Sequence, residues 1–282
     1  MKEPDLQYLS SFSQKEEKIS SMNGWFDSFS LTIFDILLNL QSNNEIFGNI
    51  LEIGVWEGKS ASTFVDMLQD REKIFLIDPI LKKKKDIIIT NFNKIIDISD
   101  EDFLFFEMTS EDFKTKILTK DIIHSFRFIH IDGNHTAEDI YKDLELADLL
   151  LLDNGIVAID DFFNMAYPQI TEALLYYIFS NPYKFRIFLC GYNKVYLCRP
   201  SMFSKYYTYV VSYFQKEFRN RNKQVSINKT SSLGDSFIIS LTDFHLGDCN
   251  EKGIRGPDWQ KNNIEIIADI NTGEEVRKYE SN

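Results

Sequence analysis

The chain has 282 residues and a formal net charge of −12, with 44% hydrophobic and 26% charged residues. This length accommodates one large α/β domain with additions, and the composition is typical of a globular protein with a sizeable core. An acidic surface repels polyanions, so we expect no nucleic-acid partner.

The sequence carries no signal for a membrane or for secretion. No run approaches the roughly 20 apolar residues of a membrane span, and residues 1–17 are charged and lack the apolar segment of a signal peptide. The cysteines Cys190, Cys198 and Cys249 are scattered and not at zinc-ligand spacing. They fit a reducing compartment, so we expect a cytoplasmic protein that does not bind a membrane.

Residues 1–48 have a mostly helical pattern, which predicts an N-terminal helical segment or lid. Short apolar runs then alternate with amphipathic stretches, as in βαβ units around a parallel sheet. Each run is continuous, as in strands buried on both faces. The predicted strands are residues 49–53, 73–77, 103–107, 126–131 and 156–159.

Two helices are expected between these strands. Apolar residues recur at helical spacing between 61 and 68 and again between 140 and 151. The pair Asn154-Gly155 is expected to end the second helix, because glycine adopts the left-handed conformation common at a helix C-terminus.

The chain after residue 161 predicts a helix over about 169–179 and then two apolar runs around a glycine-containing turn. These runs, 185–189 and 194–197, indicate a β-hairpin. We therefore expect residues 49–200 to form one ligand-binding domain.

Residues 201–282 form a predicted extension that would shape an acceptor pocket or a homo-oligomer interface. Residues 202–219 predict a helix rich in aromatic side chains. A polar stretch follows, then a strand over 236–241 and a hairpin within 264–278.

A glycine-containing turn, LEIGVWEGKS at residues 51–60, follows the first strand. The acidic Glu52 precedes Gly54 and Gly58, which let the backbone approach a ligand closely. A helix beginning near Ser60 would offer free N–H groups to the same ligand. Trp56 lies inside the turn, where its ring would pack beside the ligand. These features favour a binding turn over a purely structural one.

An acidic residue, Asp78, ends the second strand about 20 residues after the glycines. Such a carboxylate accepts hydrogen bonds from both ribose hydroxyls of a nucleoside. The G-x-x-x-G spacing differs from the G-x-G-x-x-G fingerprint, whose tighter turn suits the pyrophosphate of a dinucleotide. The pattern therefore favours S-adenosylmethionine over NAD.

Acidic residues also follow two later strands: Asp132 after residues 126–131, and Asp160 and Asp161 after residues 156–159. Ligands bind at the carboxyl ends of strands in an open α/β sheet. Three carboxylates that meet there repel one another unless a cation lies between them, and Mg²⁺ prefers oxygen ligands. The sequence predicts a divalent-cation site, with helix capping as the alternative role.

His135, three residues after Asp132, is the candidate general base for removing a proton from an acceptor hydroxyl. The ordinary histidine pKa of about 6.5 suits a base near neutral pH. The alternative is that His135 caps a helix beginning near Thr136 or orients an aspartate. His130 lies within a strand, so we expect it to be a core residue. Trp25 is expected to dock the N-terminal helix, with closure over the site as the alternative role.

The order of these segments resembles that of class I S-adenosylmethionine-dependent methyltransferases. It is similar in particular to the group of macrocin O-methyltransferase and related sugar and natural-product O-methyltransferases. The motifs that carry the resemblance, within residues 20–200, are Gly-Trp-Phe at 24–26, the turn at 51–60, I-D-G-N-H at 131–135 and A-I-D-D at 158–161. The resemblance implies a Rossmann-like α/β fold with a mostly parallel seven-stranded sheet and a terminal β-hairpin.

The resemblance also implies roles for individual residues. Glu52, Gly54 and Gly58 would flank the methionine part of the cofactor, Asp78 would bind its ribose, and Ser110 would contact its adenine. Asp132, Asp160 and Asp161 match the metal positions of catechol-type O-methyltransferases, with Asp161 in place of an asparagine and with Asp132 also beside the cofactor. His135 takes the position of the catalytic lysine of those enzymes.

The expected function is O-methylation of a small molecule, such as a sugar or a natural product, assisted by Mg²⁺ or another divalent cation. A nucleic-acid N-methyltransferase usually carries N/D-P-P-Y/F where this chain has Ile-Asp-Gly-Asn at 131–134. An NAD(P)-dependent oxidoreductase would need different glycine spacing. A non-catalytic S-adenosylmethionine-binding or scaffold protein on a degenerate methyltransferase fold is the remaining alternative, although such a protein should have lost carboxylates that are present here.

Overall fold

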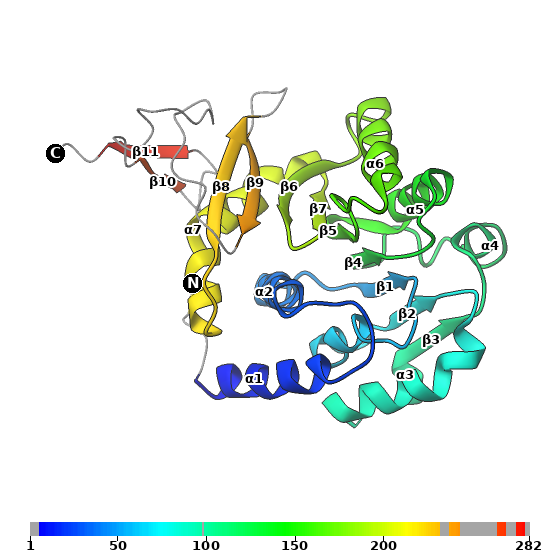
Figure 1. The fold of residues 1–282 in the computed structure, drawn as a ribbon. Coiled ribbons are helices and arrows are strands. Elements are labelled where there is room, and N and C mark those ends of the chain that lie inside the picture. The colour runs from blue at the N-terminus through cyan, green and yellow to red at the C-terminus, as the bar shows by residue number, and fades with distance from the viewer. Residues whose placement is uncertain (1–5, 98, 232–236, 243–263, 269–274, 280–282) are drawn as a thin grey trace.

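The computed structural model describes residues 6–97, 99–231, 237–242, 264–268 and 275–279, and Figure 1 shows their arrangement. Its strands are β1 (Asn49–Ile53), β2 (Ile74–Ile77), β3 (Phe103–Phe106), β4 (Phe126–Ile131), β5 (Leu151–Ile159), β6 (Arg186–Gly191), β7 (Lys194–Cys198), β8 (Ser226–Ser231), β9 (Phe237–Thr242), β10 (Ile264–Ala268) and β11 (Glu275–Tyr279). Its helices are α1 (Leu6–Ser20), α2 (Ser28–Asn43), α3 (Leu81–Ile95), α4 (Ser110–Lys116), α5 (Ala137–Leu150), α6 (Pro168–Ser180) and α7 (Phe203–Asn220).

Nine strands form one sheet in the order β3-β2-β1-β4-β5-β7-β6-β9-β8. The strands β1 to β5 pair in parallel, and β7 is antiparallel to both β5 and β6. The predicted parallel sheet and terminal hairpin are therefore confirmed. The sheet has two strands more than the seven expected, because β9 joins the edge of β6 and β8 pairs with β9.

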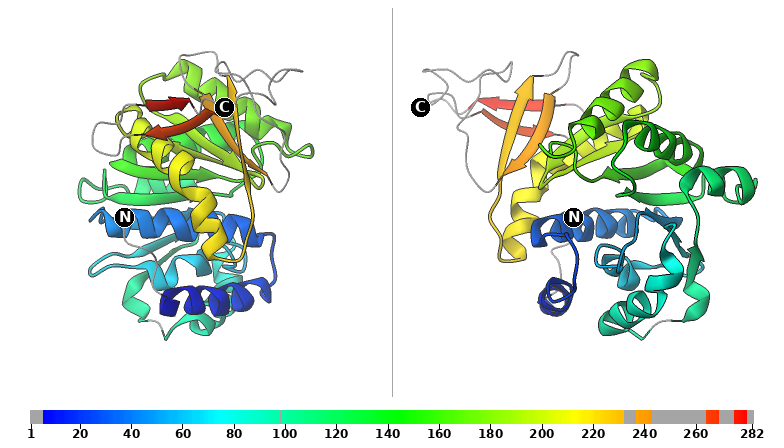
Figure 2. Two further views of the ribbon diagram at one scale, coloured as in Figure 1. Left: turned by 90° about the vertical axis from the view of Figure 1, so that its left-hand side faces the viewer. Right: turned by 45° about the vertical axis from the view of Figure 1, so that its right-hand side comes forward.

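Helices cover both faces of the sheet (Figure 2). Alternate residues along a buried strand point to opposite faces, so Ile50 packs in the layer of α2, α3 and α7 while Leu51 packs in the layer of α4, α5 and α6. Burial on both faces of the sheet explains why the sequences of these strands are continuous apolar runs. Among the described residues, no helix combines the length and apolar character that a membrane crossing requires.

The helix α2 is part of the core as well as part of the N-terminal segment. Ten of its residues are buried, and the Phe34 ring contacts the rings of Phe64 and Phe128. The Asp27 side chain caps the helix by accepting hydrogen bonds from the N–H groups of Phe29 and Ser30. Residues 20–48 therefore support the sheet that carries the site.

Two local predictions were wrong. Residues 61–68 form two short 3₁₀ turns, Ala61–Thr63 and Val65–Met67, in place of an α-helix. Gly155 lies inside β5, and α5 ends at Leu150 with no loop before the strand. A Cβ at Gly155 would lie 2.6 Å from the Leu151 side chain and 3.0 Å from the Phe126 carbonyl oxygen, so close packing requires glycine there.

A buried ion pair lies at the start of β4. Arg127 is fully buried, and its Nε and Nη2 atoms donate to the two carboxylate oxygens of Glu72, both at 2.8 Å. Nη2 also donates to the Met67 carbonyl, and Gln41 donates to the Arg127 carbonyl. These contacts connect β4 to α2 and to the turn before β2.

Candidate active site

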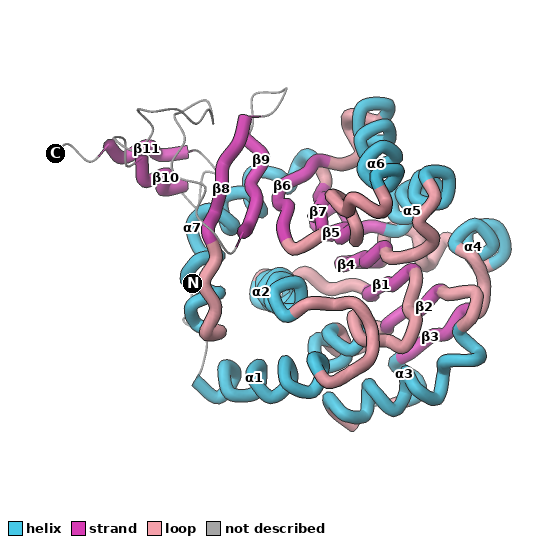
Figure 3. The backbone as a smooth tube through the Cα atoms, viewed as in Figure 1, coloured by secondary structure: helices cyan, strands magenta, loops and turns pink. Residues whose placement is uncertain are grey.

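A cavity of about 1220 Å³ opens at the carboxyl ends of the parallel strands. Its walls include the turns that follow β1, β2 and β4, the loop after β5 and the start of β7. Figure 3 shows these loops and turns in pink. The predicted site residues that line it are Gly54, Trp56, Ser60, Asp78, Ser110, Asp132, His135, Asp160 and Asp161. Glu52 and Gly58 do not line it.

The turn after β1 passes directly against the end of β4. Gly54 has a φ of +82°, and a Cβ there would lie 1.9 Å from the Asp132 carbonyl oxygen. Gly58 has a φ of +77°, and its position faces Ile88 and Phe92 of α3. Both glycines are therefore required by the geometry of the turn, and Gly54 brings the turn against the carboxylate cluster.

The Asp78 carboxylate holds this turn in place. Its Oδ2 atom accepts hydrogen bonds from the N–H groups of Val55 at 2.9 Å and Trp56 at 3.0 Å, and its Oδ1 atom accepts from that of Ile80 at 2.8 Å. A carboxylate has about four acceptor positions, so Asp78 can still accept from a ribose hydroxyl. Its predicted role in ribose binding is compatible with this second role in the turn.

Replacing Asp78 with alanine is expected to weaken S-adenosylhomocysteine binding tenfold or more. Each hydrogen bond to a charged acceptor contributes about 1.5–3 kcal/mol, and about 1.4 kcal/mol corresponds to a factor of ten. Isothermal titration calorimetry measures this loss, with Asp86→Ala on the exposed side of α3 as the control. Binding of NADH in place of S-adenosylmethionine by the wild type would contradict the assignment.

Glu52 lies beneath the cavity floor and contacts His130. Its Oε1 atom is 2.7 Å from the His130 Nδ1 atom, and both side chains are fully buried. Burial raises the pKa of Glu52 well above its usual value and lowers the pKa of His130 well below its usual value. Burial thus favours the neutral form of both groups. The role of Glu52 near the cofactor stays a prediction.

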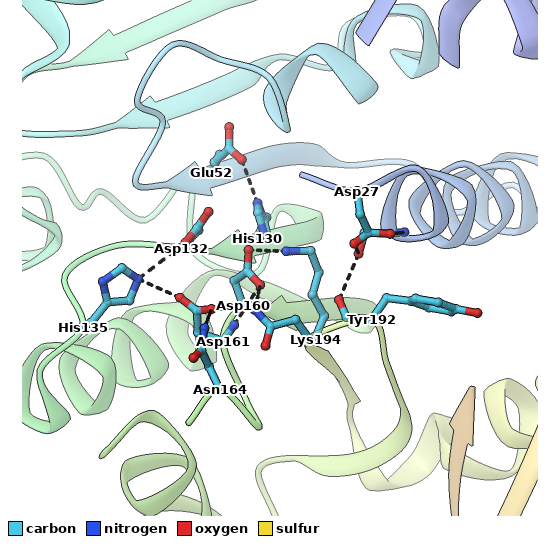
Figure 4. A network of polar contacts seen from close by, with 12 residues as sticks. Asp27, Glu52, His130, Asp132, His135, Asp160, Asp161, Asn164, Tyr192 and Lys194 are labelled. Atoms are coloured by element: carbon cyan, nitrogen blue, oxygen red, sulfur yellow. Dashed lines mark hydrogen bonds and ion pairs between the residues drawn. The ribbon is translucent and has the colours of Figure 1, made fainter. Parts of the chain in front are cut away.

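The three predicted metal ligands gather at the cavity in two overlapping groups (Figure 4). Asp132 lies with His135 and Asp161 in one group and with His130 and Asp160 in the other, and the ligand atoms within each group are within 4.8 Å of one another. Burial raises the pKa of Asp132 to about 6, and Asp160 and Asp161 add to this rise. The cluster is thus crowded with acidic groups, which a cation would stabilise.

His135 lies at the mouth of the site and contacts two of the aspartates. Its Nε2 atom is 3.0 Å from Asp161 Oδ2 and 3.9 Å from Asp132 Oδ1, and its ring stacks on Tyr167. Thr136 is the N-cap of α5, since its hydroxyl accepts a hydrogen bond from the Asp139 N–H. The capping alternative for His135 is therefore wrong, and the roles of base and of orienting residue remain.

Asp161 adopts a φ of +56°, which is unusual for a residue other than glycine. Its Oδ1 atom accepts hydrogen bonds from the side-chain amides of Asn164 at 2.7 Å and Asn193 at 2.5 Å. These bonds fix the carboxylate toward His135. Such backbone conformations concentrate at functional sites, where the surrounding structure holds them.

The β6–β7 hairpin contributes two further residues to the site, Asn193 and Lys194, that were not predicted from the sequence. Lys194 is buried and forms an ion pair with Asp160. Because β7 is antiparallel to β5, with Val195 opposite Ile159, the hairpin turn lies at the carboxyl end of β5. The predicted hairpin was the available signal, since its turn had to meet the aspartates.

At the cofactor end, Ser110 is the first residue of α4 and lines the cavity beside Asp143 of α5. Asp143 is another site residue that sequence analysis missed. Burial raises the pKa of Asp143 to about 7, and the Ser110 hydroxyl opposes this rise. The contact of Ser110 with adenine stays a prediction.

Two tryptophans stand at the rim of the cavity. Trp25 is 88% exposed, which does not fit the expected docking of the N-terminal helix. Its ring lies 6.5 Å from that of Trp56, and the Lys84 ammonium lies 4.0 Å from the Trp56 ring centre. The Lys84 ammonium also donates a hydrogen bond to the Glu57 carboxylate.

Residues 51–162 match a family described as a methyltransferase domain. The fold is similar to that of the O-methyltransferase NovP, with 14% sequence identity and a TM-score of 0.55 over 68% of this chain and 98% of that chain. It is also similar to a protein from Corynebacterium glutamicum, with 14% identity and a TM-score of 0.51 over 71% of this chain and 92% of that chain. No curated protein matches the sequence.

The matched segment contains the Gly54 turn, Asp78 and the whole carboxylate cluster. Residues 51–162 therefore form a methyltransferase domain, and the sheet order gives it a Rossmann-like fold. The predicted Rossmann-like fold and the predicted methyltransferase domain are thereby confirmed.

Proposed function

We propose that the enzyme transfers the methyl group of S-adenosylmethionine to a hydroxyl oxygen of a small molecule, with the help of a divalent cation. One observation carries the proposal: the turn held by Asp78 and the cluster around Asp132 face a single cavity. A methyl donor bound at the first can therefore meet an acceptor oxygen at the second. The similarity to NovP, an O-methyltransferase, supports oxygen as the acceptor atom.

The residues of the cluster fit a divalent cation. Asp132, Asp160 and Asp161 offer the carboxylate oxygens that Mg²⁺ prefers. The buried Nε2 atom of His130 has no hydrogen-bond partner in the described part of the chain, and His130 forms a group with Asp132 and Asp160. A cation bound here supplies positive charge that lowers the pKa of an acceptor hydroxyl.

The chain's own residues would align and activate the acceptor. Methyl transfer is an in-line displacement, so the sulfonium, the methyl carbon and the acceptor oxygen must lie in a row. His135 is placed to take the hydroxyl proton, and the contact of its Nε2 atom with Asp161 orients the ring. A vicinal diol, as in a sugar or a natural product, would suit the cluster best because its two oxygens can chelate one ion.

Incubating the protein with S-adenosylmethionine and a panel of sugars and natural-product alcohols tests the function. Methyl transfer is monitored by measuring the S-adenosylhomocysteine that is released. Mass spectrometry of the product would locate the methyl group on oxygen. Binding of S-adenosylmethionine without turnover of any hydroxyl compound would support a non-catalytic protein, and methylation on nitrogen would contradict the proposed acceptor.

Removal of divalent cations is expected to abolish most of the activity. Excess EDTA should stop product formation, and added Mg²⁺ should restore it, because the acceptor hydroxyl is too weakly acidic without a cation. Binding of S-adenosylhomocysteine, measured in parallel, should change little, since Asp78 and the N–H groups that it binds are not among the proposed cation ligands. Full activity in EDTA would exclude the cation, leaving the aspartates as hydrogen-bond partners.

A further inference from the structure

Lys194 is a buried cation inside the carboxylate cluster. Only 3% of the residue is exposed, and its ammonium pairs with Asp160 Oδ2. The ammonium also lies 5.2 Å from the centre of the Phe26 ring. Its positive charge lowers the pKa values of Asp132 and Glu52 and adds to the lowering of that of His130. Lys194 therefore acts on the electrostatics of the whole cluster.

The fold fixes this cation in place. Lys194 is the first residue of β7, and the ladder places the next residue, Val195, opposite Ile159, which precedes Asp160. Figure 4 shows the Lys194 side chain reaching Asp160. If the Lys194 side chain moved away from Asp160, both charges would be buried without a partner, and this costs free energy.

We propose that Lys194 is a positioning residue that neutralises Asp160 and so limits the affinity of the cluster for a divalent cation. The inference rests on the cation-assisted function proposed above. With Lys194 present, the three carboxylates are balanced by one ammonium and one divalent cation, so the loaded site carries no net charge. Asp132 and Asp161 then supply the negative charge that holds the divalent cation.

This role predicts the sign of a mutational effect. Lys194 repels a divalent cation and occupies an oxygen of Asp160, so its removal should tighten cation binding. A lysine that only packed Asp160 into position would have the opposite effect, because its loss would disorder a ligand. Like charges a few ångströms apart in a partly buried site repel each other strongly enough to change the affinity for the cation about tenfold or more.

The test is calorimetric titration of Mg²⁺, and of Mn²⁺ in parallel, into cation-free wild type, Lys194→Met and Lys194→Arg, without cofactor or acceptor. We expect Lys194→Met to bind the cation about tenfold more tightly or better, and Lys194→Arg to remain near the wild type because it keeps the charge. Unchanged or weaker binding by Lys194→Met would overturn the inference.

A second comparison covers the case in which Lys194→Met does not fold. Asp160→Asn combined with Lys194→Met removes both partners of the buried pair, which proteins tolerate better than loss of one. The double variant should bind Mg²⁺ more tightly than Asp160→Asn alone, and equal or weaker binding would overturn the inference. If no protein in the series binds a divalent cation, the cation-assisted part of the proposed function fails together with this inference; if the wild type binds and the variants bind no tighter, only the inference fails.

Discussion

Replacing His135 with alanine is expected to lower turnover by about 10²–10⁴-fold, the usual contribution of a general base. The affinity for S-adenosylhomocysteine should change little, because His135 contacts Asp132, Asp161 and Tyr167 at the acceptor end of the cavity. Single-turnover kinetics at saturating acceptor would measure the loss in the transfer step itself.

The dependence of the rate on pH should identify the base. Asp132 raises the pKa of His135 above its usual value, and Asp161 adds to this rise. A base must be uncharged, so the rate should rise with pH through the pKa of His135, and this rise should be absent from His135→Ala. A cation bound to the two aspartates removes the cause of the raised pKa, so titration of the His135 ring by NMR should show a lower pKa after Mg²⁺ is added.

Two variants distinguish a role of His135 as general base from a purely structural role. Tyr167→Leu removes the ring that stacks on His135 but keeps the imidazole, and His135→Asn keeps a donor to Asp161 without a base. We expect Tyr167→Leu to retain the pH profile and His135→Asn to lose it. If His135→Ala keeps most of its rate and the same profile, the transfer needs no protein base.

Replacing Arg127 with methionine is expected to reduce the free energy of unfolding by about 3–5 kcal/mol. The substitution leaves the Glu72 carboxylate buried without its partner, and the unpaired charge accounts for most of the cost. The carbonyl of Met67 loses a hydrogen bond as well. Urea unfolding followed by circular dichroism would measure the difference.

The double variant Arg127→Met with Glu72→Gln provides the control for this prediction. Removing both charges should recover part of the lost stability, because a buried pair replaced as a whole costs much less than one broken pair. The recovery should be incomplete, since Glu72 also accepts hydrogen bonds from the N–H groups of Gly48 and Gln69. Stability of Arg127→Met within 1 kcal/mol of the wild type would show that the pair is hydrated in solution.

The strands and the carboxylates that follow them could be predicted because one physical pattern marks both. A strand buried on both faces needs a largely apolar run, and a charged residue inside it needs a buried partner, as Arg127 has in Glu72. Other charged residues therefore concentrate where the strand leaves the core. This is why β1 and β4 have the predicted bounds and why Asp132 and Asp160 lie at the carboxyl ends of β4 and β5. The strand β8 (Ser226–Ser231) was not predicted from the sequence because it is polar, as a strand at the edge of a sheet can be.

Other features depend on contacts that are distant in the sequence. Two successive 3₁₀ turns bury the same apolar side chains as one short helix, so periodicity over residues 61–68 could not distinguish them. The sequence around Gly155 is typical of a helix C-cap. Glycine is required there instead because the Leu151 side chain and the Phe126 carbonyl oxygen leave no room for a Cβ atom. Lys194 could be linked to Asp160 only after β7 was placed beside β5, because no local pattern relates the two residues.

The N-terminal helices are joined by ion pairs to the residues that follow α7. Asp35 of α2 is bound by Arg221, which follows α7, at 2.9 Å, and Glu16 of α1 pairs with Lys223. The first two helices and the seventh therefore form one structural unit across some two hundred residues of intervening sequence. Replacing residues 203–223 with another sequence would therefore require compatible residues in α1 and α2, because the buried Asp35 would otherwise lose its partner.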